Sequence, residues 1–134
     1  MGDIFVDTSG WACWLDRSQP FHAEAVRAVE NVTEQGHFLI TTRYVLLELT
    51  ALLTSPLRVP KPNQIQLLAN LRTDPTTISI PIESEFDAEA WNLWSNRQDK
   101  EWSLVDCSSF VVMERRKLTH ALTTDQHFEQ AGFV

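Results

Sequence analysis

Four acidic residues, far apart in the chain, each lie within or at the end of an apolar run. Asp7 follows DIFV and Glu48 follows YVLL; Asp106 follows SLV and Asp125 follows ALTT. An ionised carboxylate is costly to bury alone, so it needs a cation, a cluster of donors or a shifted pKa. Several such carboxylates in one chain favour a single shared cation site.

The case is sharpest for Glu48, because the stretch 44–53 reads YVLLELTALL and is apolar on nearly every side of a helix. Its helical neighbours at three and four residues are Tyr44, Val45, Ala51 and Leu52. None of them is a cation, so local ion pairing does not hold the charge. The alternative is a Glu at the rim of a buried helix, with its carboxylate reaching solvent.

The other acids also have structural interpretations. Asp7 could cap the helix that follows it, and Asp125 could cap a short turn over 126–130. Asp106 stands three residues after Ser103, which is the spacing of a capping box. All four acids gathering through capping alone is a weaker hypothesis than a shared site.

The chain alternates short β-rich runs with helical patterns. The runs at 3–6, 37–41, 76–82 and 119–123 predict strands. The helical patterns cover about 9–16, 21–35, 43–54, 62–73, 84–98 and 103–117. Gly36 stands just past the second helix, where a left-handed residue is favoured. Alternating strands and helices predict an α/β fold with a mainly parallel sheet.

In such a sheet, ligands bind at the carboxyl ends of the strands. Asp7 follows the first predicted strand and Asp125 the last, while Asp106 begins a helix that would point at the same edge. Glu48 lies about one turn into the helix after the second strand. All four acids can therefore meet at one edge.

Length and composition predict one globular domain over 1–134, with 43% hydrophobic residues to supply its core. The N-terminal residues do not resemble a secretory signal, and the longest apolar runs fall far short of the roughly 20 residues that span a bilayer. We therefore expect a cytoplasmic protein that uses no membrane. Cys13 and Cys107 predict free thiols, and the histidines occur singly, which gives zinc little support.

The net charge of −7 taken alone disfavours a nucleic-acid partner, because phosphate binding normally depends on Lys and Arg. Divalent cations in a carboxylate cluster would reverse that charge locally. Two tryptophan pairs, Trp11 with Trp14 and Trp91 with Trp94, are spaced to share a helix face. We interpret both pairs as core or subunit contacts rather than as base-stacking platforms.

Four segments in order resemble the PIN-domain ribonucleases, and most closely the VapC-like toxins of type II toxin–antitoxin systems. They are FVDTSGW at 5–11, LLELTALL at 46–53, SLVDCSSF at 103–110 and LTTDQHFEQAGF at 122–133. The first and last segments are the more specific. The resemblance implies a three-layer α/β/α PIN-like fold with a short, mainly parallel central sheet of four to five strands.

The same resemblance implies a metal-dependent endoribonuclease, with Asp7, Glu48, Asp106 and Asp125 as catalytic and metal-binding residues. It implies Mg²⁺ or Mn²⁺ as cofactor, an RNA substrate, a small antitoxin as partner and a homodimer. Thr8 and Thr124 would orient the carboxylates or a bound water. Relatives usually continue into a last edge strand beyond the point where this sequence stops, so we expect that strand to be missing or very short.

Our mechanistic hypothesis is hydrolysis of an RNA phosphodiester by metal-activated water. We expect Asp7 and Asp106 to be the principal ligands, with Asp125 supporting them or holding a second ion. Glu48 would bind a metal through water or would act as the base that positions the nucleophile.

Alternatives from other classes are a non-catalytic regulatory or RNA-binding α/β module with a PIN-like or receiver-like fold. A phosphoacceptor receiver would need a second acid beside Asp7 and a late lysine, but Thr8 and Ser9 follow Asp7 and no lysine follows Lys117. A DxDxT phosphatase fails because position 9 is Ser. A silent PIN-like scaffold is disfavoured by the four acids.

Overall fold

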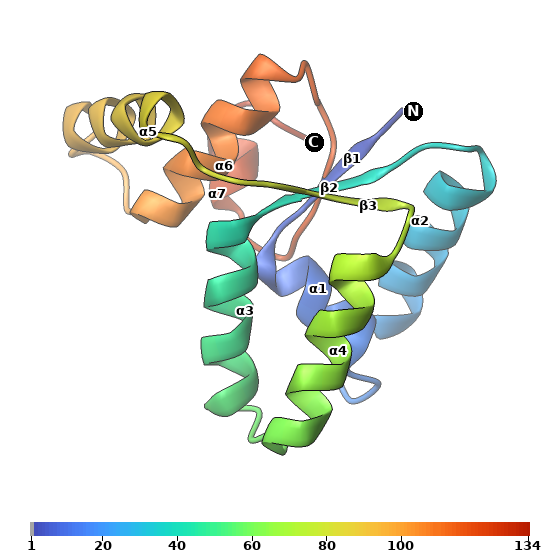
Figure 1. Ribbon diagram of the computed structural model, residues 1–134. Helices are drawn as coiled ribbons and strands as arrows, with labels where there is room; N and C mark the ends of the chain where they lie inside the picture. The colour runs from blue at the N-terminus through green and yellow to red at the C-terminus, as the bar shows by residue number, and fades with distance from the viewer. Residues whose placement is uncertain (1) are drawn as a thin grey trace.

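A computed structural model describes residues 2–134 as a parallel β-sheet covered by helices on both faces (Figure 1). The strands are β1 (Ile4–Val6), β2 (Leu39–Thr42), β3 (Thr77–Ile80) and β4 (Ala121–Leu122). The helices are α1 (Thr8–Leu15), α2 (His22–Glu34), α3 (Arg43–Thr54), α4 (Lys61–Thr73), α5 (Ser84–Asn96), α6 (Leu104–Arg115) and α7 (His127–Gln130). The three-layer α/β/α fold predicted from the sequence is confirmed.

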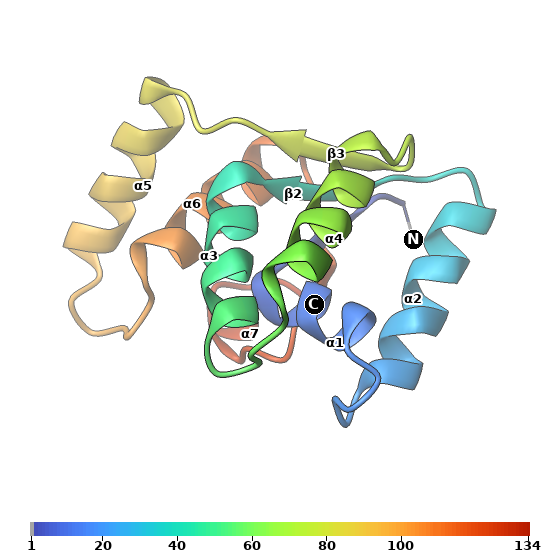
Figure 2. The same ribbon diagram turned by 60° about the horizontal axis from the view of Figure 1, so that its bottom comes forward.

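The four strands are ordered β3-β2-β1-β4, and every neighbouring pair is parallel. The two central strands, β1 and β2, are buried along their whole length, whereas β3 and β4 at the edges are half-buried. A strand covered on both faces needs apolar residues on both sides, which IFV at 4–6 and LI at 39–40 supply. Helices α1 and α3 pack against each other on one side of the sheet, and α5 packs closely on α6 on the other (Figure 2).

Local signals explain where several helices begin and end. The Thr42 side chain accepts a hydrogen bond from the Val45 backbone N–H at 3.1 Å and so caps α3. Ser103 and Asp106 form the predicted capping box at the start of α6. Gly36, with φ of 78°, stands in the left-handed region just after α2.

Two strands are shorter than predicted. The run 76–82 pairs only as far as Ile80, because Pro81 has no backbone N–H for a ladder. The run 119–123 forms a strand only over Ala121–Leu122, because the strand beside it, β1, has only three residues. No strand is assigned to the last described residues, although Val134 exchanges backbone hydrogen bonds with Thr119 and Ala121.

Side chains singled out in the sequence divide between core and surface. Both cysteines are free and buried, as predicted. Trp11 is fully buried and its ring lies 5.7 Å from that of Trp14, whereas Trp91 and Trp94 on α5 are 55% and 40% exposed. Within residues 2–134, no helix has the length and apolar character that crossing a membrane requires.

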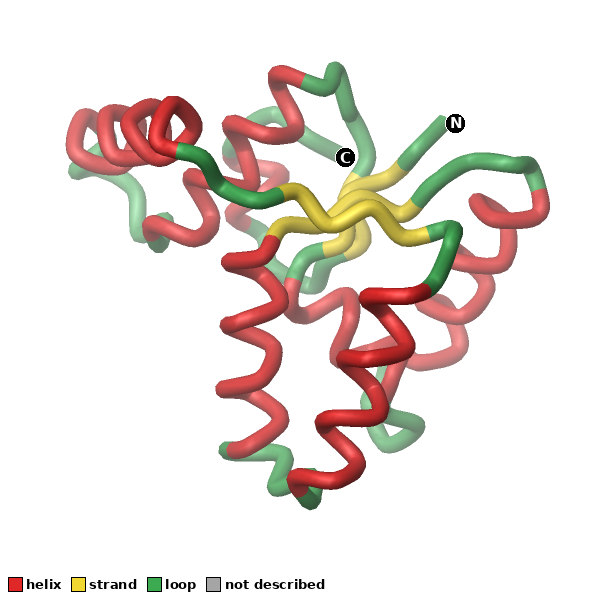
Figure 3. Tube along the Cα trace, in the orientation of Figure 1, coloured by secondary structure: helices red, strands yellow, loops and turns green. Residues whose placement is uncertain are grey.

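Because the strands are parallel, the loops after β1, β2 and β4 leave the sheet at the same edge (Figure 3). Helix α1 follows β1 after a single residue, and α3 follows β2 directly. The sheet thus brings Asp7, Glu48 and Asp125 toward one region.

The contact of α1 with β4 leads to a stability prediction. A Cβ added at Gly10 would lie 2.1 Å from the Leu122 carbonyl oxygen, so only glycine fits there without movement of the backbone. Alanine normally favours a helix, but we expect Gly10→Ala to lower the free energy of unfolding by about 1–3 kcal/mol through overpacking. Urea denaturation followed by circular dichroism measures this change.

Gly2→Ala is the matched control, because a Cβ at position 2 would meet no atom within 4 Å. It should leave the unfolding midpoint unchanged. A Gly10→Ala variant as stable as the parent chain would contradict the close packing of α1 on β4.

Candidate active site

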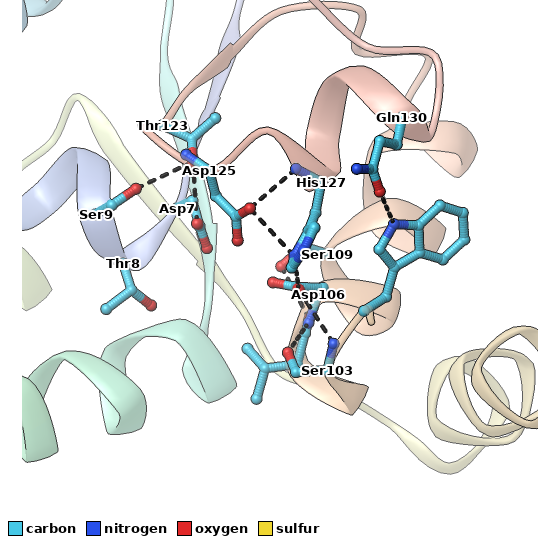
Figure 4. A network of polar contacts seen from close by, with 12 residues as sticks. Asp7, Thr8, Ser9, Ser103, Asp106, Ser109, Thr123, Asp125, His127 and Gln130 are labelled. Atoms are coloured by element: carbon cyan, nitrogen blue, oxygen red, sulfur yellow. Dashed lines mark hydrogen bonds and ion pairs between the residues drawn. The ribbon is translucent and has the colours of Figure 1, made fainter. Parts of the chain in front are cut away.

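The predicted acids line one open depression with a volume of about 560 Å³ at the carboxyl edge of the sheet. Thr8, Ser9 and His127 line it as well. Figure 4 shows Asp7, Asp106 and Asp125 converging from the end of β1, the start of α6 and the loop after β4. The convergence expected from the topology is therefore present in the fold.

Asp7 is the most buried of these acids, with 4% of its surface exposed. Its Oδ2 atom accepts a hydrogen bond from Thr123 Oγ1 at 3.2 Å. Among the described residues, its Oδ1 atom has no hydrogen-bond partner although it is buried. Asp7 holds the N-cap position of α1, yet its side chain makes no capping bond. Helix capping therefore does not account for this carboxylate.

The electrostatic environment of Asp7 disfavours its charged form. The pKa of its carboxyl is raised to about 7, chiefly by burial and additionally by the charges of Asp106 and Glu48, while hydrogen bonds oppose the rise. A divalent cation at Oδ1 would supply the missing partner and restore the ionised form.

Glu48 lies half-buried on α3, where its Oε1 atom accepts a hydrogen bond from Thr8 Oγ1. This contact joins α1 to α3 across the depression. Thr8 therefore orients the carboxylate of Glu48 rather than that of its neighbour Asp7. The Oε2 atom of Glu48 is left for other contacts.

Asp106 is 7% exposed and belongs to the capping box of α6, in which its Oδ2 accepts from the Ser103 backbone N–H at 3.1 Å. Asp125 is half-buried, and its Oδ1 accepts from the His127 backbone N–H at 2.9 Å. The structural roles considered for these two acids are thus real. Both acids nevertheless line the depression, so a structural role does not exclude a role in the site.

The protein holds each of the four carboxylates through a single oxygen. The hydrogen bonds from the described residues fall on Asp7 Oδ2, Glu48 Oε1, Asp106 Oδ2 and Asp125 Oδ1. The second oxygen of each group is thereby left available. A set of oriented carboxylates with free oxygens suits a hard divalent cation, which prefers oxygen ligands.

The structure differs from the prediction for Thr124. Its side chain is exposed, and it contributes only its backbone N–H, which donates to Ser9 Oγ at 2.9 Å. Thr123 has the expected role instead, because its Oγ1 donates to Asp7 and accepts from the Asp125 backbone N–H at 2.9 Å. Neighbouring side chains in an extended segment point to opposite sides, so only one threonine can face the acids.

His127 is a site residue that the sequence analysis missed. Its Nδ1 lies 3.1 Å from Asp106 Oδ2 and 3.1 Å from Asp125 Oδ1. Ligand atoms of these three residues lie within 4.8 Å of one another. A histidine two positions after an acid is a possible signal for this site, but His127 belongs to no paired-histidine motif.

Comparison with known proteins defines the class. The PIN domain model matches residues 4–134, so the chain belongs to the PIN-domain family, as predicted, and PIN nucleases depend on divalent metals. This result excludes the receiver-like alternative.

Two relatives define the likeness more closely. The 23S rRNA-specific endonuclease VapC20 of Mycobacterium tuberculosis is 28% identical over 131 residues, which cover 98% of this chain and 95% of VapC20. The crystal structure of VapC20, a sarcin-ricin loop cleaving toxin, matches with a TM-score of 0.87 over 98% of this chain and 96% of that one. FitAcB from Neisseria gonorrhoeae, 17% identical, matches in fold with a TM-score of 0.69, over 96% of this chain and 92% of its own.

The raised pKa of Asp7 gives a pH prediction for the metal-free protein. An acid with a higher pKa in the folded state binds more protons there, so stability falls as pH rises from about 3.8 to about 7. Asp7→Asn removes this titration. Between pH 4 and pH 8, we expect the free energy of unfolding of the variant to increase relative to that of the parent chain by on the order of 2–4 kcal/mol.

Urea denaturation in EDTA at both pH values measures the difference. With Mn²⁺ in place of EDTA at pH 8, the parent chain should become more stable than the variant, because the cation stabilises only the chain that has the carboxylate. Stability curves that run parallel from pH 4 to pH 8 would show that Asp7 is not strained in this way.

Proposed function

We propose that this chain is an endoribonuclease that hydrolyses RNA phosphodiester bonds with Mg²⁺ or Mn²⁺ in the carboxylate depression. The observation that carries the proposal is the buried Asp7 Oδ1, which has no partner among the described residues and is surrounded by three other acids. Such a group is costly unless a cation compensates it.

RNA is the substrate that the relatives favour. VapC20 is named as a 23S rRNA-specific endonuclease, and its likeness extends along nearly the whole of both chains. We therefore propose structured ribosomal RNA as the first substrate class to test. The chain's own charge of −7 would repel a polyanion, so RNA binding should itself depend on the divalent cation.

The burial of the acids suggests a different metal-binding role for each. Asp7 and Asp106 are the most buried, and we assign them as the principal ligands. Asp125 is more exposed and supports them or holds a second ion. A bound divalent cation supplies Lewis-acid stabilisation of the phosphoryl oxygens and lowers the pKa of attacking water.

Glu48 is placed to act on the attacking water. Thr8 fixes its Oε1 atom, so the carboxylate cannot rotate freely, and Oε2 is left to accept a proton. As water attacks phosphorus, one P–O bond forms, the bond to the leaving oxygen breaks, and the proton from water passes to the Glu48 carboxylate. Glu48 would thus be a general base held in position by Thr8.

The proposed biological role is that of the toxin in a toxin–antitoxin pair, acting in the cytoplasm where its RNA substrate is found. VapC20 is described as a toxin. A small antitoxin that inserts an arginine among the acids would find both charge and geometry complementary. We also propose a single functional domain over 1–134 that pairs as a homodimer. The exposed Trp91 and Trp94 would be candidates for that contact.

Substitution of single acids tests the catalytic assignment. Asp7→Asn, Asp106→Asn and Glu48→Gln should each reduce the rate of RNA cleavage by about 100-fold or more, since even a residue that only orients a ligand typically contributes 10- to 100-fold. The assay uses end-labelled structured RNA, including 23S rRNA, with Mg²⁺, Mn²⁺ or EDTA.

Asp99→Asn is the matched control, because Asp99 is exposed, lies outside the depression and forms an ion pair with Arg97. It should cleave at the parental rate. Cleavage that continues in EDTA, or in the Asp7→Asn variant, would overturn the proposal.

The antitoxin proposal has its own test. The product of the neighbouring gene, purified with this chain, should abolish cleavage at one copy per active site, and an arginine-to-alanine scan of that product should restore cleavage at one position. A complex that forms but remains fully active would contradict occlusion of the acids.

A further inference from the structure

His127 occupies a position between two of the acids. It is the first residue of α7, and its ring points at Asp106 and Asp125 (Figure 4). Nδ1 lies 3.1 Å from one carboxylate oxygen of each. One side chain thus joins an acid from α6 to an acid from the loop after β4.

The oxygens that His127 contacts are those that the backbone already holds. Asp106 Oδ2 also accepts from the Ser103 N–H at 3.1 Å, and Asp125 Oδ1 also accepts from the N–H of His127 itself at 2.9 Å. The ring therefore lies on the anchored side of both carboxylates. Asp106 Oδ1 and Asp125 Oδ2 are the oxygens left for a cation.

This geometry determines what Nδ1 does. The contact of Nδ1 with Asp106 Oδ2 at 3.1 Å has hydrogen-bond geometry, and a carboxylate oxygen is an acceptor, so Nδ1 is the donor in this contact. A protonated ring nitrogen has no free lone pair and does not ligate a metal. Of the two chemistries open to His127, donor or ligand, the contacts favour the donor.

The helix that carries His127 is firmly anchored. Phe128, the next residue, is 1% exposed, and its ring packs edge-on against Phe110 at 4.9 Å and lies 6.2 Å from Phe5. At the other end of α7, Gln130 Oε1 accepts from Trp102 Nε1 at 3.2 Å. The imidazole is therefore presented from a fixed backbone.

We propose that His127 is a positioning residue that holds Asp106 and Asp125 in the orientation that the divalent cation requires. Its Nδ1 hydrogen-bonds Asp106 Oδ2 and lies 3.1 Å from Asp125 Oδ1, so the ring holds the anchored oxygens of both carboxylates and leaves their other oxygens for the depression. The inference rests on the proposed function, because it assumes that these acids bind the cation. His127 acts through them and touches neither cation nor RNA.

Two substitutions separate the donor from the bulk of the ring. His127→Asn places an amide N–H near the position of Nδ1, whereas His127→Leu fills a similar space with no donor. Mn²⁺ titration calorimetry on the full chain measures the effect without any RNA. We expect His127→Leu to bind Mn²⁺ about 10- to 100-fold more weakly than the parent chain. We expect His127→Asn to stay within about threefold of it, because its donor is retained.

His120→Leu is the matched control, because the polar contact of His120 is to the Thr119 hydroxyl and not to a carboxylate. It should bind Mn²⁺ as the parent chain does, and thermal melts should show all variants folded. A His127→Leu variant with parental affinity, or a His127→Asn variant as weak as His127→Leu, would overturn the proposal.

The ¹⁵N resonances of the imidazole give a second readout. A donor at Nδ1 predicts that this nitrogen carries its hydrogen both without Mg²⁺ and with saturating Mg²⁺. A ring protonated only at Nε2, or loss of the Nδ1 proton on adding Mg²⁺, would show a ligand and overturn the proposal.

The outcomes distinguish this inference from the function on which it rests. Parental Mn²⁺ binding with the expected order of variants, but no RNA cleavage, would support the positioning role and contradict the nuclease. RNA cleavage with an unchanged affinity in His127→Leu would do the reverse. A parent chain that binds no divalent cation would overturn both.

Discussion

The burial of the Asp7 carboxylate beside other acids at one sheet edge determines what the surrounding residues must do. Burial and neighbouring charge raise the pKa of Asp7 to about 7, and no described residue offers a partner to its Oδ1 atom. A fold tolerates such a group only when something else contributes the missing attraction. The surrounding contacts, from Thr8, Thr123 and Ser103, hold the acids in place without neutralising them.

Much of this arrangement could be predicted from the sequence, because its signals are local. Periodicity located the strands and helices to within a few residues, and parallel topology then required the segments after β1 and β4 to leave the same edge. The resemblance to PIN-domain proteins assigned the acids. The capping box of Ser103 and Asp106 was readable because it depends on a fixed spacing.

What escaped prediction depends on contacts made in three dimensions. His127 is a single histidine in the sequence, and only the packing of α7 on Phe110 and Phe5 brings it to Asp106. Thr123 rather than Thr124 contacts Asp7 because of how one extended segment is oriented, and the sequence motif does not specify that orientation. Strand lengths were overestimated because pairing ends where the partner strand ends or where a proline removes a donor.

Asp106 both closes the capping box of α6 and lines the depression, so relatives that lose their activity still have a structural reason to keep it. A carboxylate that closes a helix cap would still be favoured after the chemistry is gone, since the helix continues to need it. The Asp7 side chain makes no capping bond, and its buried Oδ1 has no partner among the described residues. A relative that no longer binds a cation should therefore lose this aspartate before the one at position 106. The residue at position 7 would then be the more faithful marker of whether a relative remains an enzyme.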